Sequence, residues 1–217
     1  NAYFCWKALS KLSKVAEDIK NLNYFILFVH YQPERTTLPE GYGYTQILNI
    51  VLSLRSKLPD NVQLFVKEHP STYTNNCNPK YRHPSFYKKI AEIDGVDWVE
   101  IDSDNFRLID NALCTVTVTG TVGFESLVRG TPVLSYGVPV LHNCYGHYTF
   151  NDELSLQRFI EEVVSKNLDK NKISEEAIKA LKNMSKYVIP ESNTEGRQGK
   201  LNLLSSIKSQ YLETPNI

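Results

Sequence analysis

The chain has 217 residues, of which 41% are hydrophobic and 11% aromatic, and its formal net charge is zero. This length and composition allow one large domain or two small ones with a packed core. Because nucleic acids and anionic membranes attract basic surfaces, the neutral balance argues against either as the main partner. No stretch approaches the roughly 18–20 apolar residues that a membrane-spanning helix needs.

The cysteines and the start of the chain indicate a reducing compartment. Cys5, Cys77, Cys114 and Cys144 are scattered, without the CxxC or Cys/His spacing of a metal site. Cys114 stands inside an apolar run, which predicts a small core residue. The start lacks both the apolar segment of a signal peptide and an initiator methionine. We therefore expect a cytoplasmic protein whose chain here is cut from a longer one.

The first part of the chain alternates helical and strand patterns. Residues 4–21 carry apolar groups at helical spacing. The run NYFILFVH is rich in aromatic and β-branched residues and too short for a helix, so it predicts a buried strand at 24–29. A polar loop with two prolines follows, then a predicted helix over 44–58 and a second strand over 62–67.

The same alternation continues to residue 137. The predicted helices here span 85–93, 105–112 and 122–130, and the predicted strands span 97–101, 113–120 and 131–137. Short apolar strands that alternate with helices indicate parallel βαβ units with helices on both faces of the sheet. We therefore predict an α/β fold with a Rossmann-like parallel sheet.

Only helices are predicted after this sheet, over 154–166, 174–188 and 199–212. The order of elements suggests three parts: a leading helix at 1–22, a Rossmann-like domain at 23–150, and a C-terminal helical extension at 151–217 packed on that domain. We expect the leading helix to be a remnant of, or a link to, a preceding N-terminal domain.

Polar residues follow four of the predicted strands at the point where each strand ends. In open parallel sheets, ligands bind beyond these carboxyl ends. We therefore expect one binding site along this edge. Its candidate residues are Gln32, Glu34, Lys67, Glu68, His69, Pro70, Thr119, Gly120, Thr121, Gly123 and Glu125.

The segment TGTVGFE, at 119–125, has two interpretations. In the first, Gly120 and Gly123 let the backbone approach a ligand, and the helix that begins there offers free N–H groups to an anion. Thr119 and Thr121 would add hydroxyl donors. In the second, the segment is only a tight turn from strand to helix with a threonine N-cap. It is neither the GxGxxG fingerprint nor a P-loop.

The segment VKEHPS, at 66–71, also allows two interpretations. His69 can donate a hydrogen bond to a phosphate oxygen while Lys67 or Arg82 supplies positive charge, or it is a loop histidine bonded to backbone. Glu68 can accept from ribose hydroxyls or orient His69, or it is a solvated charge. Glu125 lies in the first turn of its helix, where a carboxylate is favourable in a binding or a purely structural role.

Other polar and aromatic residues are weaker candidates. Asp102 and Asp104, in EIDSDN, are predicted to cap the following helix rather than to act in catalysis. Tyr31, Tyr42 and Tyr44 can stack on a base or a sugar, or serve ordinary packing.

Three segments together resemble a known family. The stretches HYQPERTT, VKEHPS and TVTGTVGFESLVRGTPVLSYG are similar, in order and spacing, to the capsule polysaccharide biosynthesis family. These are bacterial glycosyltransferases related to the Kdo transferases of capsule and lipopolysaccharide synthesis. The resemblance covers about residues 24–148. It implies one half of a GT-B fold, in which two Rossmann-like domains face a cleft and the C-terminal one holds the activated donor.

The resemblance also implies roles for individual residues. His69 and Pro70 would form the nucleotide-phosphate motif, with His69 near the phosphate of a CMP-activated acidic sugar such as Kdo. Glu68 would contact the ribose or base, and the Thr119–Gly120–Thr121 turn would hold phosphate.

The remaining site residues have less defined roles. Gln32 and Glu34 would line the cleft, and Glu125 would reach the ribose. The candidate catalytic residues are His69 and Glu34, while the general base that deprotonates the acceptor is expected in the missing N-terminal domain.

The implied reaction transfers a sugar to a capsular or surface glycan or glycolipid, at the inner face of the cytoplasmic membrane. We expect no metal and no cofactor, because no acidic metal-binding motif is evident. Two alternatives remain open: a UDP-sugar enzyme of GT-B type (a transferase or a 2-epimerase), and a non-catalytic glycan-binding or assembly module.

Overall fold

A computed structural model describes residues 2–31, 46–74, 82–137 and 143–185. Within these ranges, seven parallel strands form one sheet in the order β1-β4-β3-β2-β5-β6-β7. This arrangement confirms the predicted Rossmann-like α/β fold. The strands are β1 Ser13–Lys14, β2 Tyr24–Phe28, β3 Gln63–Lys67, β4 Val96–Val99, β5 Cys114–Thr117, β6 Val133–Ser135 and β7 His147–Thr149.

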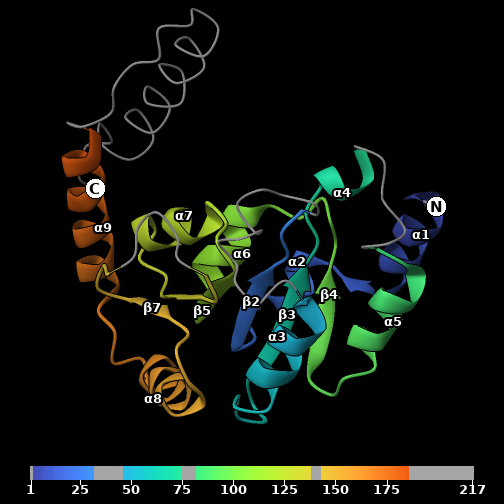
Figure 1. Ribbon diagram of the computed structural model, residues 1–217, viewed down its shortest axis with the longest axis horizontal. Coiled ribbons are helices and arrows are strands. Elements are labelled where there is room, and N and C mark those ends of the chain that lie inside the picture. Colours follow the sequence, from blue (N-terminus) through green and yellow to red (C-terminus); the bar gives the residue numbers. More distant parts are fainter. Residues whose placement is uncertain (1, 32–45, 75–81, 138–142, 186–217) are drawn as a thin grey trace, which may run out of the picture.

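Helices cover both faces of this sheet (Figure 1). Residues of α1, α3, α5 and α8 pack in the core of one face, and residues of α2, α6, α7 and α9 pack on the other. The helices are α1 Ala2–Leu12, α2 Ala16–Ile19, α3 Ile47–Arg55, α4 Ser71–Thr74, α5 Pro84–Ala91, α6 Asn105–Asn111, α7 Val122–Val128, α8 Glu153–Val164 and α9 Lys170–Ser185.

The central strands are buried on both sides, which explains their continuous apolar sequence. In β2, Phe25 and Leu27 belong to the core on one face, whereas Tyr24 and Ile26 belong to the core on the other. This alternation is the period of two that a strand imposes on its side chains. Cys114 is fully buried in β5, as predicted.

The chain reverses the direction of strand addition at β2. From β2 it adds β3 and β4 on one side, then returns to the other side of β2 with β5, β6 and β7. The carboxyl edge between β2 and β5 is therefore a topological switch point, where open α/β sheets hold their ligands. The helices α4 and α7, which follow β3 and β5, both lie along the upper edge of the sheet in Figure 1.

The leading segment differs from the single helix predicted at 4–21. It forms α1, then β1, then α2, and β1 pairs with β4 at the edge of the sheet. The Ser13 hydroxyl donates to Leu9 O at 2.8 Å, and Glu100 N donates to Lys14 O at 3.1 Å. Val15 is extended, at φ −75° and ψ 143°. The pairing of β1 with β4 and the extended backbone at Val15 end the helix although the apolar spacing continues.

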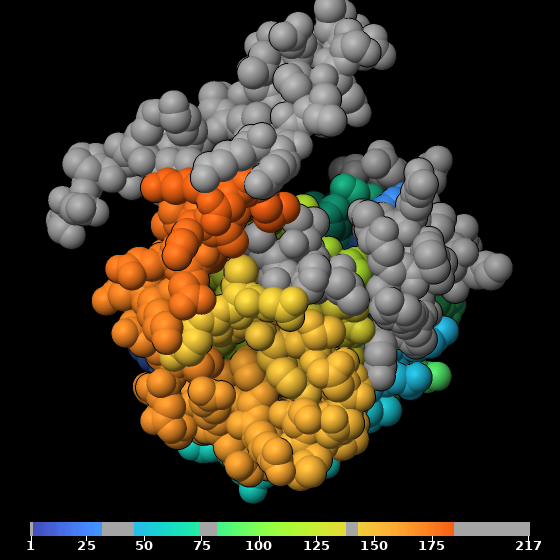
Figure 2. Space-filling view, turned by 60° about the vertical axis from the view of Figure 1, so that its left-hand side comes forward, coloured from blue at the N-terminus to red at the C-terminus, as the bar shows by residue number. Residues whose placement is uncertain are grey.

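The described residues 143–185 join the same body. The three-residue strand β7, which the sequence did not predict, pairs with β6, and Leu156 and Phe159 of α8 enter the main core. Figure 2 shows the face that α8 and α9 form, in orange. The predicted helix at 199–212 lies outside the described residues. Among the helices that are described, none has the length and hydrophobicity to cross a membrane.

Gly130 offers a test of how α7 is joined to α9. Its φ is +79°, and a Cβ there would lie 2.6 Å from the backbone oxygen of Lys170. We expect Gly130→Ala to lower the free energy of unfolding by about 2 kcal/mol, because both the left-handed backbone and the contact are unfavourable.

Gly123→Ala is the matched control. A Cβ at this buried helical position meets its neighbours at 3.4 Å and 3.5 Å, which is ordinary contact, and alanine favours a helix over glycine. Urea denaturation of both variants measures the two losses of stability. Equal losses would contradict a special requirement for glycine at position 130.

Candidate functional site

A buried ion pair lies where β3 ends. The side chains of Glu68 and Arg82 are 0% and 6% exposed. Arg82 Nε lies 2.5 Å from Glu68 Oε2, and Arg82 Nη2 donates to Glu68 Oε1 at 3.2 Å. This two-point geometry is the strongest form of a carboxylate–guanidinium contact.

Four further bonds complete this group, called here the Glu68 cluster. Glu68 also accepts from His69 N at 2.9 Å, Thr72 Oγ1 at 3.2 Å and Tyr87 Oη at 3.0 Å. Arg82 donates to the backbone oxygen of His30 at 3.0 Å. The cluster therefore joins the ends of β2 and β3 to α4 and α5.

Lys67 is turned inward as well. It is 2% exposed and its Nζ donates to Ile101 O at 2.7 Å. Burial lowers the pKa of Lys67 to about 8, against the opposing charges of Asp102, Asp104 and Glu68. Lys67 and Glu68 thus make internal contacts, and their predicted contacts with a ligand stay predictions.

His69, in contrast, is exposed at the rim of the sheet. Its Nδ1 accepts from Ser71 N at 3.1 Å, so the proton of a neutral imidazole lies on Nε2. The ring of Tyr31 lies 6.3 Å away between centroids. Pro70 is also exposed and begins the turn of α4, in which Thr72 N donates to His69 O at 3.0 Å. The strand thus ends in one outward-facing donor.

The registers of the strands place this donor relative to the turn at 119–121. β2 lies between β3 and β5, and the pairings put Lys67 and Thr117 at the same level on its two sides. His69 and Thr119 each follow two residues later. Two strand spacings separate them, or roughly 10 Å. The predicted site residues of both segments therefore lie along one edge.

The contacts in the turn indicate that close packing accounts for Gly120. Gly120 N donates to Thr117 Oγ1 at 3.1 Å, and a Cβ at position 120 would lie 2.8 Å from that same oxygen. Gly123 N donates to Gly120 O at 3.1 Å. Gly120 is thus required by its close approach to Thr117.

Part of the helix start is already hydrogen-bonded. The N–H groups of Phe124 and Glu125 donate to Thr121 O at 3.0 and 3.2 Å. Thr121 occupies the N-cap position and is exposed, yet its hydroxyl makes no capping bond. The predicted threonine cap is therefore absent, and the hydroxyl points to no described partner in the turn.

Two titratable groups near the edge have shifted pKa values. Burial raises the pKa of the half-buried Glu125 carboxyl. Burial, then the charges of Arg82 and His69, lower the pKa of the buried His30 to about 4. His30 is consequently a neutral side chain near neutral pH.

The other predicted residues have mixed outcomes. Asp104 is confirmed as a helix cap, because its side chain accepts from Phe106 N at 2.8 Å at the start of α6. Asp102 is exposed and does not cap that helix, so its predicted capping role is wrong. Gln32, Glu34, Tyr42 and Tyr44 lie outside the described residues.

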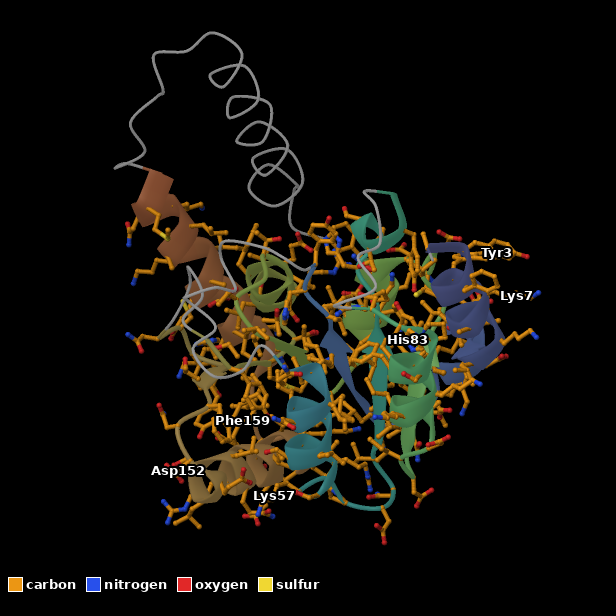
Figure 3. All side chains as sticks on the ribbon, turned by 45° about the vertical axis from the view of Figure 1, so that its right-hand side comes forward. Tyr3, Lys7, Lys57, His83, Asp152 and Phe159 are labelled. Atoms are coloured by element: carbon orange, nitrogen blue, oxygen red, sulfur yellow. The ribbon has the colours of Figure 1, made fainter. Side chains whose placement is uncertain are left out.

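The ion pair and the tyrosine that bonds to it were not predicted from the sequence. One signal was available in the segments EHPS at 68–71 and RHPS at 82–85. Both contain His-Pro-Ser, and the residues that precede it, Glu68 and Arg82, have opposite charges. His83 caps α5 as His69 caps α4, with Nδ1 accepting from Ser85 N at 3.2 Å. Figure 3 marks His83 at the start of α5. Tyr87 gives no such signal.

The chemistry available at this edge is hydrogen-bond donation. The imidazole of His69 and the hydroxyls of Thr119 and Thr121 are groups that can donate to phosphate or hydroxyl oxygens. In the described ranges, no group of three His, Cys, Asp or Glu side chains is placed to hold a metal ion.

The sequence matches one protein-family model. That family is described as capsule polysaccharide biosynthesis protein, and the match covers residues 39–187. Among curated proteins, none matches the sequence.

Solved structures share the fold at low identity. Anabaena HepE in complex with UDP-glucose has a TM-score of 0.50 and 14% identity, over 94% of this chain and 53% of that one. The Thermosulfurimonas dismutans KpsC beta Kdo 2,7 transferase has a TM-score of 0.45 and 18% identity, over 73% and 49%. The UDP-GlcNAc 2-epimerase of Methanocaldococcus jannaschii has a TM-score of 0.48 and 15% identity, over 75% and 45%. The chain spans about half the length of these structures.

The Glu68 cluster predicts strong coupling between its charges. Glu68→Gln and Arg82→Met should each cost about 3–5 kcal/mol of unfolding free energy, because each leaves one buried charge uncompensated. The double variant should cost clearly less than the sum, as measured by urea denaturation.

A surface pair provides the control. Arg129 and Asp110 also make two bonds, but both side chains are partly exposed. Asp110→Asn should cost less than about 1 kcal/mol. Additive losses at Glu68 and Arg82 would contradict the proposed cluster.

His30 predicts a loss of stability in acid. Its pKa falls from 6.5 in the unfolded chain to about 4 in the fold, so between these values the unfolded chain binds the extra proton. Stability from this group is therefore complete above pH 6.5 and is lost as the pH falls toward 4. Relative to His30→Asn, the native protein should lose up to about 1.4 kcal/mol per pH unit. Parallel urea-denaturation profiles for the two proteins would reject this shift.

Proposed function

The chain belongs to the capsule polysaccharide biosynthesis family, and from this premise we propose that it is the donor-binding half of a glycosyltransferase. The donor in this proposal is a CMP-activated acidic sugar of the Kdo type. The acceptor is a hydroxyl group of a capsular or surface glycan or glycolipid, and the reaction needs no metal or cofactor.

One observation carries the proposal: the exposed Nε2 donor of His69 at the carboxyl edge beside the switch point. Its Nδ1 is occupied by Ser71 N, so the ring presents Nε2–H outward. The hydroxyls of Thr119 and Thr121 stand along the same edge, on the other side of β2. A nucleotide phosphate between the two segments would accept from both.

These donors suit the charge that develops in glycosyl transfer. The bond between the anomeric carbon and the phosphate oxygen breaks, and the acceptor oxygen forms the new bond to that carbon. The leaving phosphate gains negative charge, so donors aimed at it stabilise the transition state more than the ground state. The acceptor proton passes to a general base, for which Glu34 and the N-terminal domain are the candidates.

The Glu68 cluster has a positioning role in this mechanism. Glu68 holds His69 N at 2.9 Å, and Arg82 ties the same carboxylate to the end of β2. Arg82 is neutralised by Glu68 in the interior, so the phosphate would be held by His69 and the threonine hydroxyls rather than by a lysine or arginine clamp. Glu68 and Lys67 then act on the ligand only through the residues that they position.

The chain spans about half the length of the matching structures. We propose that a second Rossmann-like domain supplies the other side of the cleft and that the enzyme works at the inner face of the cytoplasmic membrane. The alternative donor is a UDP-sugar, and a chain that binds no nucleotide would be a glycan-assembly module.

His69→Ala tests the proposal directly. The variant should lose the rise in melting temperature that CMP gives the native chain. In the enzyme that contains this chain, turnover should fall about a hundredfold, because a donor to the leaving phosphate is lost.

His83→Ala is the matched control, since His83 also precedes Pro-Ser and caps a helix through Nδ1. It should keep the CMP effect. Equal losses in both variants, or none in either, would reject the role of His69. Stabilisation by UDP instead of CMP would identify the alternative donor, and stabilisation by neither would favour the assembly module.

A further inference from the structure

A pocket lies beside this edge, between α1 and the loop that follows β4. Its volume is about 240 Å³, below the roughly 300–1,000 Å³ of pockets for drug-sized ligands. Trp6 and Ser10 line it from α1, and Glu100 and Asp102 line it from the loop. This pocket is called here the Trp6 groove.

The groove opens at the same end of the sheet as His69. Val99 pairs with Lys67 of β3, so Glu100 stands one residue beyond the level of Lys67. The Nζ of Lys67 holds Ile101 O at 2.7 Å and so fixes the loop of the groove. Since β4 is the neighbour of β3, the groove and His69 belong to adjacent stretches of one edge.

The carboxylates and hydroxyls that line the groove accept hydrogen bonds. Glu100 and Asp102 are exposed carboxylates, and in the part of the chain that is described neither forms an ion pair. The Ser10 hydroxyl already donates to Trp6 O at 2.9 Å, and Ser13 donates to Leu9 O, so their oxygens only accept further bonds. A ligand must therefore bring its own donors.

The apolar side of the groove is formed by the exposed indole ring of Trp6. Trp6 is 45% exposed, although an indole ring is one of the largest apolar side chains. It continues a row of exposed rings on α1, at 6.4 Å from the centroid of Tyr3. Figure 3 shows Tyr3 and Lys7 of this helix pointing away from the sheet. A ring with one apolar face and several hydroxyl donors matches this combination of indole and carboxylates.

We propose that the Trp6 groove binds an uncharged sugar residue, with one face of the pyranose ring on the Trp6 indole and its hydroxyls donating to Glu100 and Asp102. The proposed function adds only that this sugar belongs to the acceptor glycan. Because both carboxylates repel a third, the groove discriminates against uronic acids. It thereby differs from the donor-rich edge at His69, which takes an anion.

Tryptophan fluorescence can report on this site. The chain has two tryptophans, and Trp98 is fully buried, so acrylamide quenching reports on Trp6. Galactose, glucose and N-acetylglucosamine are the neutral probes, and galacturonate and glucuronate are the matched acids with the same rings. We expect at least one neutral sugar to protect Trp6 from quenching at millimolar concentration. Its acid counterpart should need a concentration at least about tenfold higher for the same protection.

Variants assign the effect to the groove. Glu100→Ala and Asp102→Ala should each abolish the protection. Phe4→Ala removes a ring on the same helix that is 63% exposed and outside the groove, and Glu175→Ala removes an exposed carboxylate on α9. Both controls should keep the protection.

Three results would overturn the proposal: no protection by any neutral sugar, equal protection by sugar and uronate, or protection that survives both carboxylate variants. The readout is independent of the nucleotide. Sugar protection without CMP or UDP stabilisation would reject the donor site alone, and the converse result would reject the groove alone.

Discussion

The buried pair of Glu68 and Arg82 is the constraint on which the rim of the sheet depends. Removing two charges from water is costly, and their attraction offsets the cost only when every remaining polar atom is also bonded. Thr72, Tyr87 and the His30 carbonyl supply such bonds here. The main consequence is geometric. Because the carboxylate also accepts from His69 N, the chain must leave β3 in one direction, and the imidazole emerges outside the core.

The two His-Pro-Ser segments show how a short pattern is used twice. In each, the proline ends the preceding extended chain, and the histidine Nδ1 accepts from the serine N–H two residues later. The charges that precede them are opposite and pair in the interior. Each segment thus combines a local hydrogen bond at a helix start with one member of a long-range ion pair, because Glu68 precedes α4 and Arg82 precedes α5.

The sheet was predictable because its central strands are buried on both faces and therefore read as unbroken apolar runs. β1 and β7 were not predicted, because strands of two or three residues show no period and depend on the neighbour with which they pair. The order of these strands along the chain was predicted, although three of them end two or three residues earlier than expected. The inward direction of the Lys67 and Glu68 side chains was not predicted. Glu68 and Lys67 face inward because Arg82 and the Ile101 carbonyl are their partners in the interior. A hydropathy pattern does not show which polar residues have buried partners.

The two proposed sites have opposite hydrogen-bonding character along one edge of the sheet, and this difference favours different ligands at each. At His69 and Thr121 the protein offers donors, whereas at Glu100 and Asp102 it offers acceptors. A phosphate is repelled by the second pair, and a neutral sugar gains less from the first. If the two proposals hold, a nucleotide sugar and a neutral glycan that approach this rim are directed by charge to different parts of it. Lys67 stands between the two regions, and because it is buried and bonded to Ile101 O it supports the loop of the groove.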